Sequence, residues 1–176
     1  MAEMFNPKIV VAQLNIPSGA VVADFGCGSG YFTLELAQAV GPKGKVFAID
    51  VVPEQLESVR SLAQMRGLSD IIETRWANLE KTSTLEKESC DWVIAANLFF
   101  QISNDLKESV LKEAANILKN GGKIAIIDWK KDSVIGPPKE QRFDKEEIIQ
   151  LAARQKLKLF KEINLGDTHW CVVLIK

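Results

Sequence analysis

The sequence predicts an α/β fold in which a mostly parallel sheet carries helices on both faces. Short apolar runs alternate along the chain with segments whose apolar residues recur every three or four positions, the pattern of strands joined by helical crossovers. The last two apolar runs lie only a few residues apart, too close for a crossover, and must pair antiparallel. With 176 residues the chain has room for one full core, and we expect residues 1–176 to form a single domain.

The first half of the chain supplies strands joined by amphipathic helices. The expected strands are 20–25, 45–50 and 71–77. The helix after the first strand has apolar residues at i, i+4 and i+8, and Gly41-Pro42 ends it. The next helix begins at Pro53 and ends at Gly67. This part of the chain therefore predicts two successive strand–helix–strand units.

The second half continues the alternation and closes the sheet. The expected strands are 91–97, 123–129, 157–164 and 170–175. A helix with Leu106, Val110, Ala114 and Ile117 on one face follows the first of these. The turn 120–122, Asn-Gly-Gly, is expected to release the next strand. A last helix is predicted at 145–156, where Asp144 and Glu147 stand at capping-box spacing.

A glycine-rich loop follows the first strand in the stretch VVADFGCGSGYFTLELA. It lies at the carboxyl edge of the sheet, where open α/β folds bind ligands. The dinucleotide fingerprint needs a third glycine where Tyr31 stands, and no Gly-Lys-Ser/Thr follows for a P-loop. The loop therefore favours a ligand other than a dinucleotide or a nucleoside triphosphate.

The charges around this loop indicate the chemistry of that ligand. Between Lys8 and Lys43 the sequence contains no Lys or Arg, whereas Asp24 precedes the loop and Asp50 ends the second strand. A carboxylate at the end of the second strand can accept both hydroxyl protons of an unphosphorylated ribose. The pattern predicts a ligand with a cationic group and a ribose diol.

Composition and charge disfavour several other classes of protein. The formal net charge of −1 gives no long-range attraction for nucleic acid. No apolar run approaches the roughly 18 residues of a membrane span, and we expect a cytoplasmic protein without a membrane partner. Cys27, Cys90 and Cys171 are odd in number and widely spaced, which fits neither a disulfide framework nor a metal site.

Taken together, the motifs resemble those of class I S-adenosylmethionine-dependent methyltransferases. Within these, the chain is similar to the small type-11-like group related to ubiquinone/menaquinone-biosynthesis methyltransferases. DFGCGSGYF resembles the first motif of the family and FAIDVVPEQLE the second, and DWVIAANLFFQI and LKNGGKIAIIDWK resemble the motifs of strands four and five. The resemblance implies a Rossmann-like, mostly parallel seven-stranded sheet with an antiparallel C-terminal hairpin.

The resemblance also implies the residues of the site. Together with the charge pattern, it assigns the S-adenosylmethionine site to Asp24, Phe25, Gly26, Cys27, Gly28, Gly30, Asp50, Val51, Ala77, Asn78 and Asn97. Substrate contacts are expected where strands four and five end, at Phe99, Phe100, Trp129 and Lys130. A general base is needed only if the acceptor nucleophile carries a proton, and the candidates are Asp128 and His169.

The predicted function is methyl transfer to an acceptor by direct displacement at the sulfonium. The segments that remain available to bind the acceptor favour a small molecule. Two alternatives stay open: a protein or RNA methyltransferase, and a noncatalytic module that binds the cofactor and a partner. The acceptor and the oligomeric state are not determined by the sequence, since fold does not fix substrate.

Overall fold

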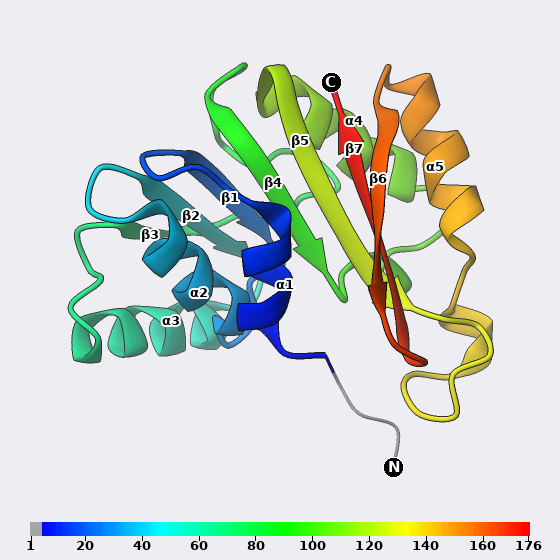
Figure 1. The fold of residues 1–176 in the computed structure, drawn as a ribbon, viewed down its shortest axis with the longest axis horizontal. Coiled ribbons are helices and arrows are strands. Elements are labelled where there is room, and N and C mark those ends of the chain that lie inside the picture. Colours follow the sequence, from blue (N-terminus) through cyan, green and yellow to red (C-terminus); the bar gives the residue numbers. More distant parts are fainter. Residues whose placement is uncertain (1–4) are drawn as a thin grey trace.

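The computed structural model describes residues 5–176 and contains a seven-stranded sheet of order β3-β2-β1-β4-β5-β7-β6 (Figure 1). The strands are β1 (Val21–Phe25), β2 (Lys45–Asp50), β3 (Ile72–Trp76), β4 (Cys90–Ala96), β5 (Leu118–Trp129), β6 (Lys158–Leu165) and β7 (His169–Ile175). The pairs among β1 to β5 are parallel, and β7 runs antiparallel to both β5 and β6. The predicted sheet with its antiparallel C-terminal hairpin is confirmed.

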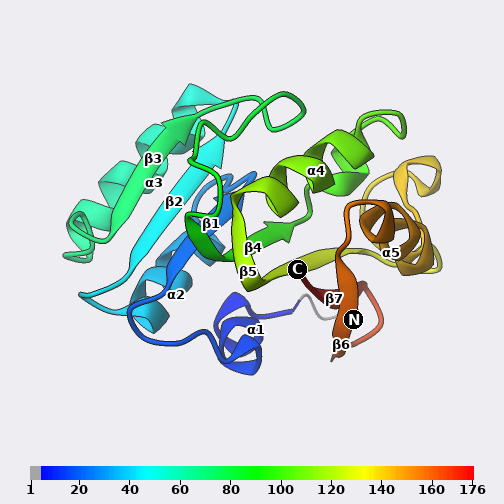
Figure 2. The ribbon, with the colours of Figure 1, turned by 90° about the horizontal axis from the view of Figure 1, so that it is seen from above.

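Helices cover both faces of the sheet, as predicted. The helices are α1 (Pro7–Leu14), α2 (Tyr31–Val40), α3 (Pro53–Met65), α4 (Lys107–Ile117) and α5 (Lys145–Arg154), with short 3₁₀ turns η1 (Phe99–Gln101) and η2 (Lys139–Gln141). Apolar residues of α1, α2 and α3 share one core cluster, and those of α4 and α5 share the other. Figure 2 shows α1 and α2 on one side of the sheet and α4 and α5 on the opposite side.

The N-terminal helix α1 was not among the elements that the sequence pattern predicted. It begins at Pro7, and the side chain of Asn6 caps it by accepting a hydrogen bond from the Lys8 N–H, at 2.9 Å. Val10, Val11 and Leu14 are buried. An asparagine before a proline at the first helical position is a helix-start signal, and it was present in the sequence.

Regular pairing of β5 with β4 and β7 begins at Lys123, as the turn at 120–122 predicted, but the strand itself starts earlier than predicted. The strand β5 begins at Leu118, directly after α4, and the register of its pairing with β4 shifts between Cys90 and Trp92. Gly121, with φ of 78°, supplies the left-handed residue of this irregularity, and its N–H donates to the carbonyl of Lys176 at 3.1 Å. The last residue of the chain therefore holds these residues in the sheet, a contact that local sequence cannot reveal.

The capping box at the start of α5 is confirmed, since Asp144 and Glu147 each accept a hydrogen bond from the backbone of the other. The helix ends at Arg154, two residues before the predicted boundary. Helix ends are uncertain by this amount in any sequence-based reading.

The order of the strands sets the position of the site. Between β1 and β4 the direction of the crossovers reverses, so the loops that follow these two strands diverge at the carboxyl edge of the sheet. The loop after β3 lies beside them, and it is tied to α4 because the N–H of Ser83 donates to Glu113 Oε1 at 2.6 Å. Ligand-binding residues of this protein are therefore expected on the loops after β1, β2, β3 and β4.

Candidate functional site

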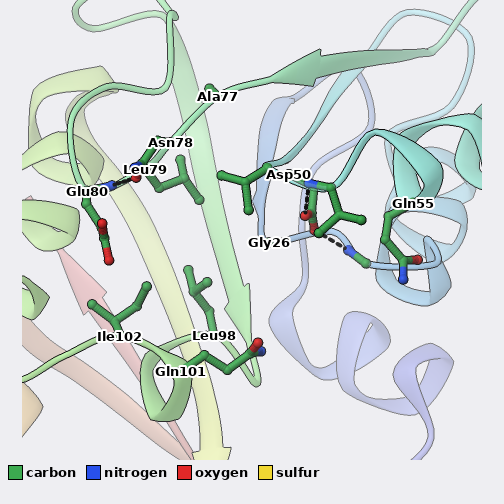
Figure 3. Close-up of a pocket in the computed structure, with 13 residues that line it drawn as sticks. Gly26, Asp50, Gln55, Ala77, Asn78, Leu79, Glu80, Leu98, Gln101 and Ile102 are labelled. Carbon is green, nitrogen blue, oxygen red and sulfur yellow. Dashed lines mark hydrogen bonds between the residues drawn. The ribbon is translucent and has the colours of Figure 1, made fainter.

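Two adjoining hollows lie at the carboxyl edge of the sheet. The first has a volume of about 450 Å³ and is lined by Gly26, Gly28, Asp50, Val51, Val52, Gln55, Ala77, Asn78, Leu79, Glu80, Leu98, Gln101 and Ile102 (Figure 3). The second has a volume of about 430 Å³ and is lined by Phe5, Pro7, Asp24, Gly26, Cys27, Gly28, Ser29, Tyr31, Phe32, Ala96, Asn97 and Gln101. Because Gly26, Gly28 and Gln101 border both, one extended ligand can occupy the two together.

The glycine loop forms the boundary between the hollows. Its first part is tied to β2, because the N–H groups of Gly26 and Cys27 donate to the carbonyl of Ile49 at 2.9 and 3.0 Å. Gly26, Gly28 and Gly30 all have positive φ. A Cβ built on Gly26 or Gly30 would lie 2.9 Å from a side chain, whereas a Cβ on Gly28 meets nothing within 4 Å. Gly28 alone among the three therefore faces open space, which is the space of the hollows.

Asp50 ends β2 and holds the other side of the glycine loop. Its Oδ2 accepts a hydrogen bond from the Gly28 N–H at 2.9 Å, and its Oδ1 accepts one from the Val52 N–H at 3.0 Å (Figure 3). Each carboxylate oxygen has a further lone pair, and Asp50 lines the first hollow. Asp50 thus caps the strand end and can also accept hydrogen bonds from a ligand.

The rest of the first hollow is largely apolar. Leu79, Leu98 and Ile102 face it from the loops after β3 and β4, across from Asp50 (Figure 3). Asn78 uses its side-chain oxygen locally, accepting from the Glu80 N–H at 2.9 Å. A flat apolar group fits between these side chains, with polar contacts at the Asp50 end.

Asp24 is the buried acid of the second hollow. It is 1% exposed, and the hydroxyl of Thr33 on α2 donates to its Oδ2 at 2.6 Å. Burial raises the pKa of Asp24 to about 7, against the opposing hydrogen bond from Thr33 and with a further rise from the negative charge of Asp50. Near neutral pH this carboxyl is poised between its two protonation states.

Charge in the two hollows is of one sign. Among residues 5–176, their lining includes the acids Asp24, Asp50 and Glu80 and contains no Lys or Arg. Such a site attracts a cationic ligand and disfavours phosphates and carboxylates as the main binding group. This lining is compatible with the ligand predicted from the sequence, which carries a cationic group and a ribose diol.

Most of the predicted cofactor residues lie at these hollows, and two do not line them. Phe25 is fully buried in β1 and belongs to the core. Gly30 starts α2, where a side chain would collide with Val59 of α3. Gly30 thus permits the close approach of two helices, and its structural role is independent of ligand contact.

The residues predicted to contact substrate are not brought to either hollow. Phe99 is fully buried, with its ring 6.5 Å from that of Phe143. Trp129 is 9% exposed and stacks on His169, and the ammonium of Lys130 donates to the carbonyl of Gly166 at 2.7 Å. Burial and packing of the strand ends turn these side chains away from the hollows.

Phe100 and the two candidate bases also have structural partners. The carboxylate of Asp128, fully buried, accepts from the N–H of Phe100 at 3.2 Å and of Trp129 at 2.8 Å. His169 is fully buried as well. Burial raises the pKa of Asp128 to about 7, against the opposing backbone hydrogen bonds. Neither Asp128 nor His169 lines the two hollows, so this geometry gives no support to a role as a base.

Several lining residues were missed by reasoning from the sequence. They include Leu79, Leu98 and Ile102 in the first hollow, Phe5, Pro7, Tyr31 and Phe32 in the second, and Gln101 between the two. Tyr31, the first residue of α2, is 74% exposed although aromatic. Recognition of the Asn-Pro helix start would have placed Phe5 beside α1, whereas nothing local indicated that α1 would pack against α2.

Among residues 5–176, no helix is long and apolar enough to cross a membrane. The same residues contain no group of three or more His, Cys, Asp or Glu side chains arranged to hold a metal ion.

The sheet order, the glycine loop after β1 and the carboxylate that ends β2 define the class I S-adenosylmethionine-dependent methyltransferase fold. A family model described as "Methyltransferase domain" matches residues 22–122, more than half of the chain. The chain belongs to this family of S-adenosylmethionine-dependent methyltransferases.

Relatives and solved structures agree on the family and differ in acceptor. A solved S-adenosylmethionine-dependent methyltransferase from Aquifex aeolicus is 27% identical, with a TM-score of 0.88 over 98% of this chain and 90% of that one. A ribosomal protein L11 methyltransferase from Syntrophomonas wolfei is 31% identical over 77% of this chain and 42% of its own length. A demethylmenaquinone methyltransferase from Oceanobacillus iheyensis is 24% identical over 88% and 63%. The chain thus spans less than two thirds of these curated relatives.

The first prediction compares Gly28 with Gly30, which have different surroundings. Changing Gly28 to Ala places a methyl group in the space between the hollows, and we expect it to weaken binding of S-adenosylmethionine strongly with a small loss of stability. Changing Gly30 to Ala places a methyl group against Val59, and we expect the melting temperature to fall by several degrees. Calorimetric titration and thermal melts of both variants test this. Normal affinity in a folded Gly28→Ala protein would contradict it.

The buried carboxyl of Asp24 generates the second prediction. Its pKa is about 7 in the folded protein and about 3.8 when exposed. Between these values the folded state retains a proton that the unfolded state has released, so this group makes the unliganded protein less stable as pH rises. Asp24→Asn cannot ionise, and it should gain stability relative to wild type between pH 5 and pH 8. Denaturant unfolding at both values measures this difference, and a difference that shrinks or stays constant contradicts the prediction.

Proposed function

We propose that this protein transfers the methyl group of S-adenosylmethionine to a small-molecule acceptor. The observation that supports this most is the pair of adjoining hollows divided by Gly28, one with a carboxylate at a strand end and the other with aromatic walls. One hollow suits the nucleoside of the cofactor and the other suits its amino-acid end together with the acceptor. The members of the family methylate both small molecules and proteins, so the acceptor class is the part that needs a test.

The residues present fit the cofactor by their chemistry. Asp50 retains a lone pair on each oxygen for a ribose diol. Ala77, Leu79, Leu98 and Ile102 offer apolar surface to a flat base. The uniformly acidic lining suits a ligand that carries a sulfonium and an ammonium group. Gly28 leaves open space where any side chain would intrude.

The second hollow supports a small, apolar acceptor. Phe5, Tyr31 and Phe32 supply aromatic surface from the segment before α1 and from the start of α2. In the part of the chain that the structure describes, no cationic side chain lines this hollow to bind a phosphate or a carboxylate. Its size of about 430 Å³ lies in the range of small-molecule sites, which is roughly 300 to 1,000 Å³. An acceptor with an aromatic or aliphatic body suits these walls.

S-adenosylmethionine supplies a methyl group on a positively charged sulfur, which is already a good leaving group. The contribution of this chain is therefore position and exclusion of water. Aromatic walls orient the acceptor, and Asp50 and the glycine loop fix the opposite end of the site. In well-oriented systems such positioning lowers a barrier by roughly 7 to 11 kcal/mol. Neither Asp128 nor His169 lines the two hollows, and a nucleophile that carries no proton at neutral pH needs no base.

Asp50 generates a third prediction. Changing Asp50 to Ala removes the acceptors for the ribose and also those for Gly28 and Val52. Because a hydrogen bond to a charged group contributes roughly 1.5 to 3 kcal/mol, we expect affinity for S-adenosylmethionine to fall about tenfold to a hundredfold. The melting temperature should also fall by a few degrees, since the loop loses its anchor. Asp70→Ala, at an exposed acid outside both hollows, is the control. Unchanged affinity in Asp50→Ala would remove this residue from the site.

The acceptor class generates a fourth prediction. The protein is incubated with cofactor labelled in its methyl group and with separate fractions of a cell extract, namely small molecules, protein and RNA. We expect the label to appear in the small-molecule fraction and in proportion to the amount of enzyme. Gly28→Ala protein serves as the inactive control. Label found in protein or RNA would replace the proposed acceptor class, and label in no fraction would favour a noncatalytic cofactor-binding module.

A further inference from the structure

The buried side chain of His169 packs against Phe5, a residue that lines the second hollow. His169, the first residue of β7, is fully buried. Its ring centroid lies 4.0 Å from that of Trp129 on β5 and 4.6 Å from that of Phe5. Phe5 lines the second hollow. The imidazole therefore lies one side chain away from the space in which a ligand binds.

Both ring nitrogens of His169 have a partner. Nδ1 lies 2.8 Å from the hydroxyl oxygen of Thr168, and Nε2 lies 3.0 Å from Oδ1 of Asn97. Burial lowers the pKa of His169 to about 4, so the ring is neutral near pH 7 and carries a single N–H. An amide oxygen can only accept. The proton is therefore on Nε2, and Nδ1 accepts from the Thr168 hydroxyl.

This arrangement fixes the amide of Asn97. Asn97 follows β4 in a left-handed conformation, with φ of 54°. Its backbone N–H donates to the carbonyl of Ile127 at 2.8 Å, and its own carbonyl accepts from Nε2 of Gln101 at 2.7 Å. Since Oδ1 faces His169, the two N–H groups of Nδ2 lie at the other end of the amide.

The two N–H groups of Nδ2 belong to a residue that lines the second hollow. Within residues 5–176, Nδ2 of Asn97 makes no hydrogen bond, and no buried side-chain nitrogen or oxygen there lacks a partner. The Nδ2 atom is therefore accessible, and Asn97 is a lining residue of the second hollow. The hydrogen bond from His169 thus holds the amide of Asn97 in one orientation, with its two N–H groups available to a ligand in the second hollow.

We propose that His169 is a positioning residue that holds Asn97 with its amide donors directed at an oxygen atom of the bound ligand. The partner is a carboxylate or carbonyl oxygen, because a donor pair needs an acceptor. That oxygen comes either from the amino-acid end of the cofactor or from the methyl acceptor. The inference rests on the proposed function only in treating the second hollow as a ligand site.

Two substitutions of His169 separate positioning from packing. His169→Phe keeps an aromatic ring between Trp129 and Phe5 and removes the donor to Asn97. His169→Gln loses the ring and keeps an amide N–H that can reach Oδ1 of Asn97. If the histidine only packs, His169→Phe has both the higher melting temperature and the higher ligand affinity of the two variants. If it positions Asn97, the glutamine variant binds ligand better even where its melting temperature is lower.

The measurement is calorimetric binding of S-adenosylhomocysteine and of 5′-methylthioadenosine, which keeps the nucleoside and the sulfur but lacks the amino-acid end. We expect His169→Phe to weaken S-adenosylhomocysteine roughly tenfold, the scale of one charged hydrogen bond. His169→Gln should bind within about twofold to threefold of wild type. Unchanged affinity for 5′-methylthioadenosine in both variants assigns the oxygen to the carboxylate of the cofactor.

The remaining outcomes either assign the oxygen to the acceptor or overturn the inference. If both ligands bind all variants equally but methyl transfer falls in His169→Phe and recovers in His169→Gln, the oxygen belongs to the acceptor. If losses follow the melting temperature, or if no variant differs from wild type in binding or transfer, His169 does not position Asn97. Wild-type protein that binds neither ligand would overturn the proposed function itself, which distinguishes that failure from a failure of this inference.

Discussion

The site depends on the link between Asp50 and the glycine loop. A single carboxylate at the end of β2 accepts the N–H groups of Gly28 and Val52 and so fixes the start of α3 and the middle of the loop after β1 relative to each other. The backbone of Gly26 and Cys27 is fixed to the same strand through Ile49. A Cβ built on Gly28 would meet nothing within 4 Å, and the two hollows meet across this residue.

Negative charge near this link gives the hollows their chemical character. Asp24 is buried, its side-chain hydrogen-bond partner among residues 5–176 is the hydroxyl of Thr33, and Asp50 adds a second charge nearby. In the absence of ligand, burial without a cation keeps Asp24 partly protonated at neutral pH. A positively charged ligand nearby favours the ionised form of Asp24, because it offsets the unfavourable burial of the negative charge. Binding of a cation in the second hollow would therefore shift Asp24 toward its ionised form.

Reasoning from the sequence succeeded where local pattern and chemistry coincide. The strands carry near-continuous apolar runs because both faces of the sheet are covered, and the capping box of α5 is a purely local signal. The structure brings the glycine loop and Asp50 together at the carboxyl edge of the sheet, where the sequence pattern placed them. The predicted substrate residues Phe99 and Trp129 do not line the two hollows: Phe99 belongs to a core cluster, and the ring of Trp129 packs against His169. An aromatic residue at a strand end suits a core as well as a pocket, so the sequence alone does not decide between the two.

By itself, the sequence determined the class of fold, the edge of the sheet that carries the site and the acidic character of that site, because these follow from periodicity, glycine placement and the absence of Lys and Arg from one stretch. Only the tertiary structure decided which aromatic residues border the ligand space and that His169 supports Asn97 from behind. The physical reason is distance along the chain: His169 and Asn97 are 72 residues apart and meet only because β7 inserts between β5 and β6. No local pattern records such a contact.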